Sequence, residues 1–556
     1  MKKAMLSIML VIIMLSFWVA GCTPSANPST PEQAVSTEAP TEEPTEIQEV
    51  SEPPVGGTLH IGIDFEPGTY DIHKMSGWDD TQMAFFNGTL VAFNPDTNEL
   101  SPYLADSWTI SEDGLTYTFK LKEGVKFHNG DTLTAKDWCY TFERAMSPET
   151  ASPVASTSWG LVTNCTVIDD YTMSFTISEP SYTFLMGLNY ATAGPVSKRA
   201  IEELGADYGQ QAVGVGPYLL KEYVSGEKIV YERNPDYTWG PSWVHTGPAY
   251  IQTVEYRIIP EYSTLIAGLE SGDLDIIPTV DYSDISRFEG DGRFTKIEGQ
   301  QQGMNPLVVF NVAKPPFDDI RVRKAFNLAI NREDLVTIVL KGNGMPLYGP
   351  ITANTLGYDP IVESLGYHYD LEQAKALMQE AGYTYDSGGM LLTPDGQPFV
   401  LDLITSTYGT SSKNAEVLVE QFRALGVQMT IQLLDSSIVW DKEMAGDFQI
   451  TATYGLGWYD AEIMRMGMHS SQMGSLNIFQ VQDPVLDEIL DRTITTVDPE
   501  QRQAAVTEAQ KYIIEKAYLA PLYSTIGFTA LNNRIQGAKY CIKTGQLWYQ
   551  DAYIAQ

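Results

Sequence analysis

The side chains best able to do chemistry are six histidines and a cluster of methionines, and their spacing predicts little catalysis. No histidine has a partner at metal-ligand spacing; the six are His60, His73, His128, His245, His368 and His469. The soft donors of Met464, Met466, Met468 and His469 would suit Cu(I), but alternating methionines beside a pocket more often pack flexibly against a variable ligand. We therefore expect no metal and no cofactor.

The common local signatures of enzymes are missing. The sequence contains no H-E-x-x-H, no G-x-S-x-G and no G-x-x-x-x-G-K-[ST], which are motifs of metalloproteases, hydrolases and nucleotide-binding proteins. A carboxylate pair like that of glycosidases stays open, because distance along the sequence says nothing about distance in space. The sequence favours a binding protein without catalytic residues over an extracellular hydrolase.

The four cysteines predict neither a zinc site nor a dithiol. None of Cys22, Cys139, Cys165 and Cys541 lies at C-x-x-C spacing. If Cys22 carries lipid, three thiols remain and at most one disulfide can form. The sequence leaves open which cysteines pair, if any.

The first residues predict export. Lys2 and Lys3 precede an uncharged apolar run over residues 4–19, which ends in Ala-Gly-Cys at residues 20–22. A charged start, a short apolar core and small residues at the cut make a signal peptide. A transmembrane helix is the alternative, but a run of about 16 residues is shorter than the roughly 20 that span a bilayer.

The ending Val-Ala-Gly-Cys resembles the lipobox of bacterial lipoproteins. This resemblance implies that residues 1–21 are removed and that Cys22 carries diacylglycerol, which anchors the protein outside the cytoplasm to the bacterial cell membrane. Residues 22–56 then form a linker. Residues 23–55 include seven Glu and seven Pro but no Lys, Arg, Asp or aromatic residue, which is the composition of a disordered spacer.

The body that follows must hold any site in place, and it is large, apolar and acidic. The chain is 43% hydrophobic with a formal net charge of −36, which predicts two or three domains and argues against nucleic acid as a partner. Strand and helix patterns alternate, which predicts an α/β or α+β mixture with mixed sheets. We expect strands over residues 58–63, 116–121, 172–177, 228–232, 251–259, 307–311, 399–405 and 428–434, and helices over 135–145, 263–271, 321–329, 371–381, 412–425, 484–493 and 499–517.

A series of segments from about residue 57 to the C-terminus resembles one family. In order they read SPYLADSW (101–108), DGLTYTFKLK (113–122), GVKFHNG (124–130), GVGPY (214–218), RNPDY (233–237), SGDLD (271–275) and PFDDIRVRKA (316–325). Together they resemble the peptide/nickel class of ABC-transporter solute-binding proteins, family 5. Most of these residues suit turns and ion pairs of the scaffold, so we expect them to identify the fold without contacting ligand.

The resemblance implies an α/β fold of the periplasmic-binding-protein type, a type II clamshell of two lobes with an extra domain inserted in the first. By analogy, lobe I takes residues 57–86, 199–300 and 520–556. The extra domain takes residues 87–198, and lobe II takes residues 301–519. Two crossings of the chain between the lobes would form a hinge.

The resemblance also implies where a ligand sits. Relatives that bind peptides hold the backbone as an added strand between a loop of lobe I and a Gly-Trp segment of lobe II, so that main-chain hydrogen bonds carry the affinity. The matching segments here are Ser76-Gly77-Trp78 and Gly457-Trp458-Tyr459.

Those relatives place an aspartate just after the tryptophan to pair with the amino terminus of the peptide, and Asp460 is the candidate here. This segment is shorter than in many relatives, so Glu462 is the alternative, and a structural reading has Asp460 capping a helix that begins at Ala461. Trp78, Trp159 and Trp458 could stack on sugar rings as readily as they could cover apolar peptide side chains.

Together the two resemblances imply a monomeric, lipid-anchored receptor that is not an enzyme. It would capture short peptides by hinge closure and deliver them to the separate permease and ATPase subunits of an ABC importer. An oligosaccharide receptor on the same scaffold is the main alternative. A nickel or haem receptor would place histidines in the cleft, and a hydrolase is the alternative from another class.

Overall fold

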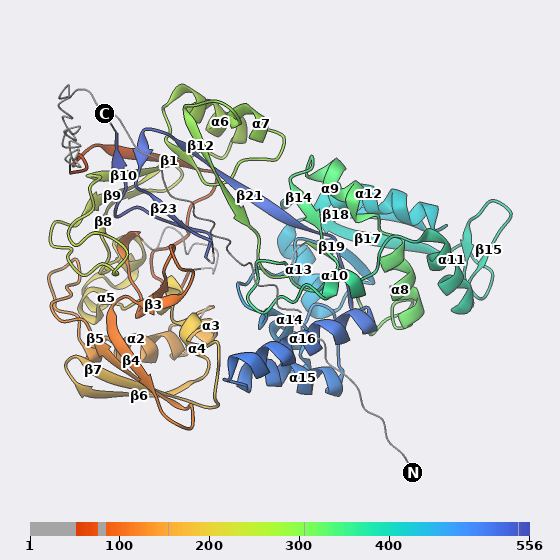
Figure 1. Cartoon of the computed structure of the whole chain (residues 1–556), viewed down its shortest axis with the longest axis horizontal. Helices are drawn as coiled ribbons and strands as arrows, with labels where there is room; N and C mark the ends of the chain where they lie inside the picture. Colours follow the sequence, from red (N-terminus) through yellow and green to blue (C-terminus); the bar gives the residue numbers. More distant parts are fainter. Residues whose placement is uncertain (1–51, 76–84, 154, 305, 543, 556) are drawn as a thin grey trace, which may run out of the picture. The chain divides into compact units, whose positions relative to one another are not determined.

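The computed structural model describes residues 52–75, 85–153, 155–304, 306–542 and 544–555. The expected signal peptide, Cys22, nearly all of the linker and the expected binding segment Ser76-Gly77-Trp78 lie outside the described residues. Residues from Pro53 to the C-terminus form one contact unit. Its strands gather into three large sheets and several short pairs, and helices pack among them (Figure 1).

The largest sheet has eight strands from four separate stretches of the chain. They are β1 (Thr58–Ile63), β8 (Tyr218–Val224), β9 (Lys228–Arg233), β10 (Thr253–Ile258), β11 (Ile276–Ile277), β12 (Phe294–Gln300), β14 (Gly344–Pro346) and β21 (Tyr523–Asn532). The order is β12-β21-β11-β1-β10-β9-β8, with β14 paired to β21 outside this path. In β1, Leu59 and Ile61 are buried as alternate residues, which is the period of two of a strand.

Helices α5 (Lys198–Leu204), α6 (Tyr262–Ser271) and α7 (Ile285–Phe288) and the 3-10 helix η2 (Gly205–Gln210) lie between strands of this sheet along the chain. The chain after β21 forms two short pairs, β22 with β25 and β23 with β24. Their bounds are β22 (Ile535–Gln536), β23 (Lys539–Cys541), β24 (Gln546–Trp548) and β25 (Tyr553–Ile554).

A four-stranded antiparallel sheet lies in the middle of the stretch between β1 and α5. Its order is β4-β5-β7-β6, with β4 (Ala105–Ile110), β5 (Thr116–Leu121), β6 (Val162–Asp169) and β7 (Thr172–Ile177). The same stretch contains β2 (Val91–Phe93), β3 (Leu100–Pro102), α2 (Ala135–Met146), α3 (Ala155–Trp159), α4 (Phe184–Gly187) and the 3-10 helix η1 (Ala191–Ala193). Large buried aromatic side chains, Trp138 and Phe175 among them, fill its core.

One disulfide joins α2 to β6. Cys139 and Cys165 are bonded, and Cys541 is a buried free thiol. A disulfide across this sequence separation of 26 residues stabilises a fold by about 3 kcal/mol, because it restricts the unfolded chain. The structure thus decides the pairing that the sequence left open.

The five-stranded sheet is mixed and has the order β18-β17-β19-β13-β20. Its strands are β13 (Leu307–Phe310), β17 (Val400–Ser406), β18 (Gln428–Leu434), β19 (Ile450–Thr453) and β20 (Leu519–Pro521). β17 runs parallel to both β18 and β19, whereas β13 is antiparallel to its neighbours. The carboxyl ends of β17 and β19 therefore meet at one edge.

Most helices of this part of the chain pack around the five-stranded sheet (Figure 1). They are α8 (Ile320–Leu328), α9 (Arg332–Val339), α10 (Val362–Leu365), α11 (Leu371–Glu380), α12 (Ser411–Ala424), α13 (Ser436–Ala445), α14 (Ile463–Met468), α15 (Pro484–Thr495) and α16 (Pro499–Lys516). The remaining elements are β15 (Thr384–Tyr385), β16 (Leu391–Leu392) and the 3-10 helix η3 (Ser470–Gln472).

Each expected strand and helix is confirmed to within two residues at either end. The start of α16 shows why. The side chain of Asp498 accepts a hydrogen bond from the Gln501 N–H at 2.9 Å, and Pro499 follows in the first turn. An N-cap acceptor followed by proline favours this helix start.

The long strand β21 is shared between parts of the chain (Figure 1). Its first three residues pair with β14, and the following residues, from Ile526, pair with β12. Just before it, β20 completes the five-stranded sheet. The expected domain boundaries remain a prediction. The membership of the three sheets agrees with them apart from two strands: β14 lies in the range expected for lobe II but pairs in the eight-stranded sheet, and β20 straddles the expected boundary at residue 519.

No described helix combines the length and the apolar character that crossing a membrane requires.

Candidate functional site

A cavity of about 830 Å³ lies at the edge where β17 and β19 end. Ser406 and Thr453, the last residues of these two strands, line it, together with one face of α13. The loop after β1 lines it from the side of the eight-stranded sheet, through Phe65 and Gly68. In open α/β sheets, ligands bind outside the carboxyl ends of the strands, and the volume suits a small molecule or a short peptide.

The segment after β19 lines this cavity and leaves main-chain groups unbonded. The N–H and C=O of Leu456 bond to the C=O and N–H of Met304, at 3.1 and 2.8 Å. The next two residues, Gly457 and Trp458, line the cavity. Among the described residues, nothing in the chain bonds to the N–H or C=O groups of Gly457 and Trp458. Two donors and two acceptors of this segment thus have no partner among the described residues.

Gly303 packs directly against the backbone of this segment. Its φ is +90°, a conformation that L side chains rarely adopt. A Cβ at this position would lie 2.3 Å from the carbonyl oxygen of Leu456 and 2.6 Å from the nitrogen of Trp458. Only glycine allows the two backbones to approach so closely.

Aromatic rings stack beside the cavity and connect two distant stretches of the chain. The Tyr190 ring stacks on Trp458, with centroids 4.9 Å apart, and on Tyr459, at 5.3 Å. The Tyr459 hydroxyl donates a 2.5 Å hydrogen bond to the carbonyl oxygen of Met186. Tyr190 and Trp458 line the cavity, whereas Tyr459 is buried and lines a neighbouring cavity of about 70 Å³.

Asp460 does not line the large cavity, and its side chain is fully buried. Its Oδ1 accepts hydrogen bonds from the Arg502 guanidinium at 2.5 Å and from the Glu462 N–H at 2.7 Å. Arg502 also lies over the ring of Tyr182. The pairing of Asp460 with the amino terminus of a peptide stays a prediction; in this structure the carboxylate pairs with Arg502.

Glu462, the alternative to Asp460, lines the small cavity. Burial, and then the nearby negative charge of Asp460, raise the pKa of Glu462 to about 7. The helix that Asp460 was expected to cap begins at Ile463, two residues later than expected, and Glu462 occupies its N-cap position.

Trp159 is placed in a hydrophobic core. Its side chain is fully buried against Phe142 and Phe175, and it does not line either cavity described above. Gly457 and Trp458 therefore lie at the large cavity, Tyr459 and Asp460 lie beside it, and Trp159 lies apart from it.

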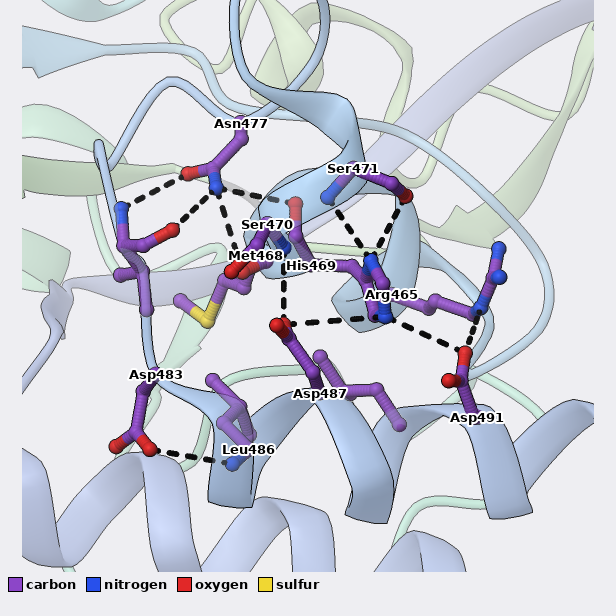
Figure 2. A network of polar contacts seen from close by, with 12 residues as sticks. Arg465, Met468, His469, Ser470, Ser471, Asn477, Asp483, Leu486, Asp487 and Asp491 are labelled. Atoms are coloured by element: carbon purple, nitrogen blue, oxygen red, sulfur yellow. Dashed lines mark hydrogen bonds and ion pairs between the residues drawn. The ribbon is translucent and has the colours of Figure 1, made fainter.

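The methionine and histidine cluster does not converge on one point. Met464 and Met468 are buried in the core, whereas Met466 lines the large cavity. Figure 2 shows the thioether of Met468 pointing away from the His469 ring. The Nε2 of that ring lies 3.3 Å from a carboxylate oxygen of Asp491. These positions favour packing over copper ligation.

Sequence reasoning missed the contribution of α13. One face of this helix, with Ser436, Val439, Trp440 and Glu443, lines the cavity. The signal available was Asp435 followed by two serines, and the Asp435 carboxylate does accept the Ser437 N–H at 2.9 Å. That signal marks a helix start but does not indicate which face binds ligand.

The family of the chain follows from comparison with known proteins. Residues 99–475 match the model of bacterial extracellular solute-binding proteins, family 5 middle. The chain belongs to this family. Family 5 proteins bind solutes and are not enzymes, and the match covers the four-stranded sheet, the Gly457-Trp458 segment and α13.

Relatives of family 5 match along most of their length. The chain is 26% identical to heme-binding protein A of Haemophilus influenzae, covering 81% of this chain and 83% of the relative. It is 25% identical to the oligopeptide-binding protein AppA of Bacillus subtilis, covering 97% and 96%. The solved structure of the periplasmic binding protein DppA of Helicobacter pylori, in complex with the peptide STSA, matches with a TM-score of 0.75 at 24% identity, over 90% of this chain and 99% of that one. The fold is therefore the α/β fold of family 5.

Proposed function

We propose that this family 5 protein captures short peptides outside the cytoplasm and delivers them to the permease and ATPase subunits of an ABC importer. The observation that carries the proposal is the pair of residues Gly457 and Trp458, which line the cavity and whose main-chain N–H and C=O groups have no hydrogen-bond partner among the described residues. An extended peptide satisfies such groups as an added strand, whatever its side chains. Two similar proteins support peptides as the ligand class: AppA is an oligopeptide-binding protein, and DppA was solved in complex with the peptide STSA.

The proposed site includes Gly457 and Trp458 on one side of the peptide and Ser76-Gly77-Trp78 on the other, with Tyr459 and Asp460 as further candidate contacts behind Trp458. The cavity wall already combines residues that follow β1 with residues of α13. A ligand that touches both walls stabilises the closed arrangement over an open one. Two connections link the eight-stranded sheet to the five-stranded sheet beside β21: the segment that follows β12 and the segment between β20 and β21. We propose that these two segments form the hinge.

Haem and nickel are the less favoured cargo. Heme-binding protein A is among the relatives, but no histidine is among the described residues that line the large cavity. Oligosaccharides remain the alternative that Trp440 and Trp458 favour, since both indoles line the cavity. A thermal-shift screen with di- to pentapeptides, oligosaccharides, haem and Ni²⁺ separates these ligands. Stabilisation by sugars and not by peptides would overturn the proposal.

Trp458→Ala is expected to weaken peptide binding at least tenfold, because it removes an aromatic wall of the cavity and its stacking on Tyr190. Isothermal titration calorimetry with a peptide from the screen measures the loss. Trp458→Phe is the matched control and should recover most of the affinity, because it retains an aromatic face. Unchanged affinity in the alanine variant would place the peptide elsewhere.

The lipid anchor proposed at Cys22 has its own test. Cys22→Ala is expected to move most of the protein from the membrane fraction to the soluble extracytoplasmic fraction, because without acyl chains nothing holds the leader-processed protein at the bilayer. Fractionation followed by immunoblotting measures the shift, with Ser25→Ala as a control outside the lipobox. Retention of the alanine variant in the membrane fraction, with its amino terminus processed, would refute the anchor.

A further inference from the structure

The described wall of the large cavity is aromatic and acidic. Two carboxylates, Glu66 and Glu443, lie among the described lining residues, and no Lys, Arg or His does. Six aromatic side chains also line it: Phe65, Tyr190, Tyr408, Trp440, Tyr454 and Trp458. Aromatic faces and carboxylates both attract cations, so the wall favours positively charged ligands.

The two carboxylates differ in what they already bind. Glu66 accepts hydrogen bonds from the Ser225 hydroxyl at 2.7 Å and the Gly226 N–H at 2.9 Å, which ties it to the turn between β8 and β9. Glu443 is 1% exposed and accepts one hydrogen bond, from the Thr451 hydroxyl at 2.6 Å. Glu443 is therefore the carboxylate with bonding capacity left for a ligand.

No cation of the described chain neutralises Glu443. Lys442, on the same helix, pairs with Asp447 at 2.6 Å. Lys314, from another part of the chain, donates to the carbonyl oxygen of Gly446 at 2.5 Å. The groups packed against Glu443 from other elements, Thr451 of β19 and Gln480, are neutral, and Gln480 donates to the main-chain oxygen of Glu443. A buried carboxylate without a cation is costly, and a cationic ligand offsets that cost.

We propose that the cavity selects ligands that carry an ammonium or guanidinium group, and that Glu443 accepts this group. The proposal rests on the peptide-binding function above and names its preferred ligands: peptides whose basic side chain or amino terminus reaches Glu443. The aromatic rings that line the same cavity add cation–π attraction.

The proton on Glu443 gives the preference a pH dependence. Burial raises the pKa of Glu443 to about 7. Below that pH a cationic ligand must displace the proton, so its apparent affinity rises as pH increases through 7 and levels off above it. A neutral ligand has no such requirement, and its affinity should change little over the same range.

The test compares tripeptides that differ in one charge, by calorimetry at pH 8 with the wild-type protein and the isosteric Glu443→Gln variant. The probes are Ala-Lys-Ala, the same peptide acetylated on the lysine side chain, on the amino terminus or on both, Ala-Glu-Ala, and spermidine as a cation that is not a peptide. Wild type is expected to bind Ala-Lys-Ala at least tenfold more tightly than the doubly acetylated peptide. The singly acetylated peptides show which amine is recognised.

In Glu443→Gln, the ratio of the affinity for Ala-Lys-Ala to that for the doubly acetylated peptide is expected to fall below threefold. The affinity for the doubly acetylated peptide should be retained, which would show that the variant is folded. Asp441→Asn removes an exposed charge from the same helix and should leave the ratio unchanged. Equal binding of the basic, neutral and acidic peptides by wild type overturns the inference while peptide binding stands. Binding of spermidine that depends on Glu443, without binding of any peptide, overturns the peptide function and supports the inference. Failure of every probe overturns both.

Discussion

Asp460→Ala is expected to lower the free energy of unfolding by about 3–5 kcal/mol, because it leaves the Arg502 guanidinium buried without its counterion. The two side chains are 0% and 4% exposed, with Arg502 2.5 Å from Oδ1 of Asp460. Arg502 also donates to the carbonyl oxygen of Thr493 and lies 4.2 Å from the centre of the Tyr182 ring. Chemical denaturation monitored by circular dichroism measures the loss.

Two comparisons assign that loss to the ion pair. A double variant that combines Asp460→Ala with Arg502→Met no longer buries an unpaired guanidinium, so it should recover part of the stability. Glu508→Ala breaks an exposed pair with Arg492 on the neighbouring surface, 2.9 Å long, and should cost no more than about 1 kcal/mol. A loss in Asp460→Ala as small as that of Glu508→Ala would show that the buried pair is unimportant.

The same variant tests the proposed role of Asp460 in ligand binding. If its carboxylate pairs with the amino terminus of a peptide, Asp460→Ala weakens binding of free peptides far more than of N-acetylated ones. Equal losses for the two kinds of peptide would leave Asp460 with the structural role that Arg502 indicates. Binding must be measured at a temperature where denaturation shows the variant to be folded.

Gly303→Ala is expected to reduce peptide affinity more than tenfold. The added Cβ would meet the Leu456 carbonyl oxygen at 2.3 Å and the Trp458 nitrogen at 2.6 Å, and both are backbone atoms, which cannot rotate aside as the end of a flexible side chain can. The substitution therefore displaces the main-chain groups that we propose to bind the peptide. The left-handed φ of +90° adds strain on the order of 1–3 kcal/mol.

Gly290→Ala separates the two effects. Gly290 has a φ of +78°, but nothing lies within 4 Å of a Cβ built there. Gly290→Ala should therefore have the same backbone strain as Gly303→Ala but retain peptide binding. Calorimetry on both variants, with denaturation to follow stability, makes the comparison. Normal affinity in Gly303→Ala would exclude the Gly457-Trp458 main chain from the site.

The elements could be predicted from sequence because their signals are local. The Asp498-Pro499 start of α16 and the alternation in β1 depend on residues a few positions apart. The family motifs then gave the fold, which local patterns alone do not specify. The disulfide between Cys139 and Cys165 stayed open, because pairing depends on bringing α2 against β6.

The site was less accessible to sequence reasoning. Gly457 and Trp458 were expected from the family resemblance, and the structure places both at the cavity. The partner of Asp460 is Arg502, 42 residues away, and no local pattern connects them. Glu443 was missed because an acidic residue in a helix ordinarily faces water. Its burial depends on packing α13 against β17 and β19.

The sheet order also has a consequence for how the chain acquires its fold during synthesis. β21 lies between β12 and β11, in the interior of the eight-stranded sheet, and β20 forms an edge of the five-stranded sheet. Both strands come from residues 519–532, whereas the other strands of the two sheets come from residues 58–453. Neither sheet has its full set of strands until residues 519–532 have been synthesised, so the segments made earlier must wait with unpaired strand edges, which are the edges that chaperones protect from aggregation.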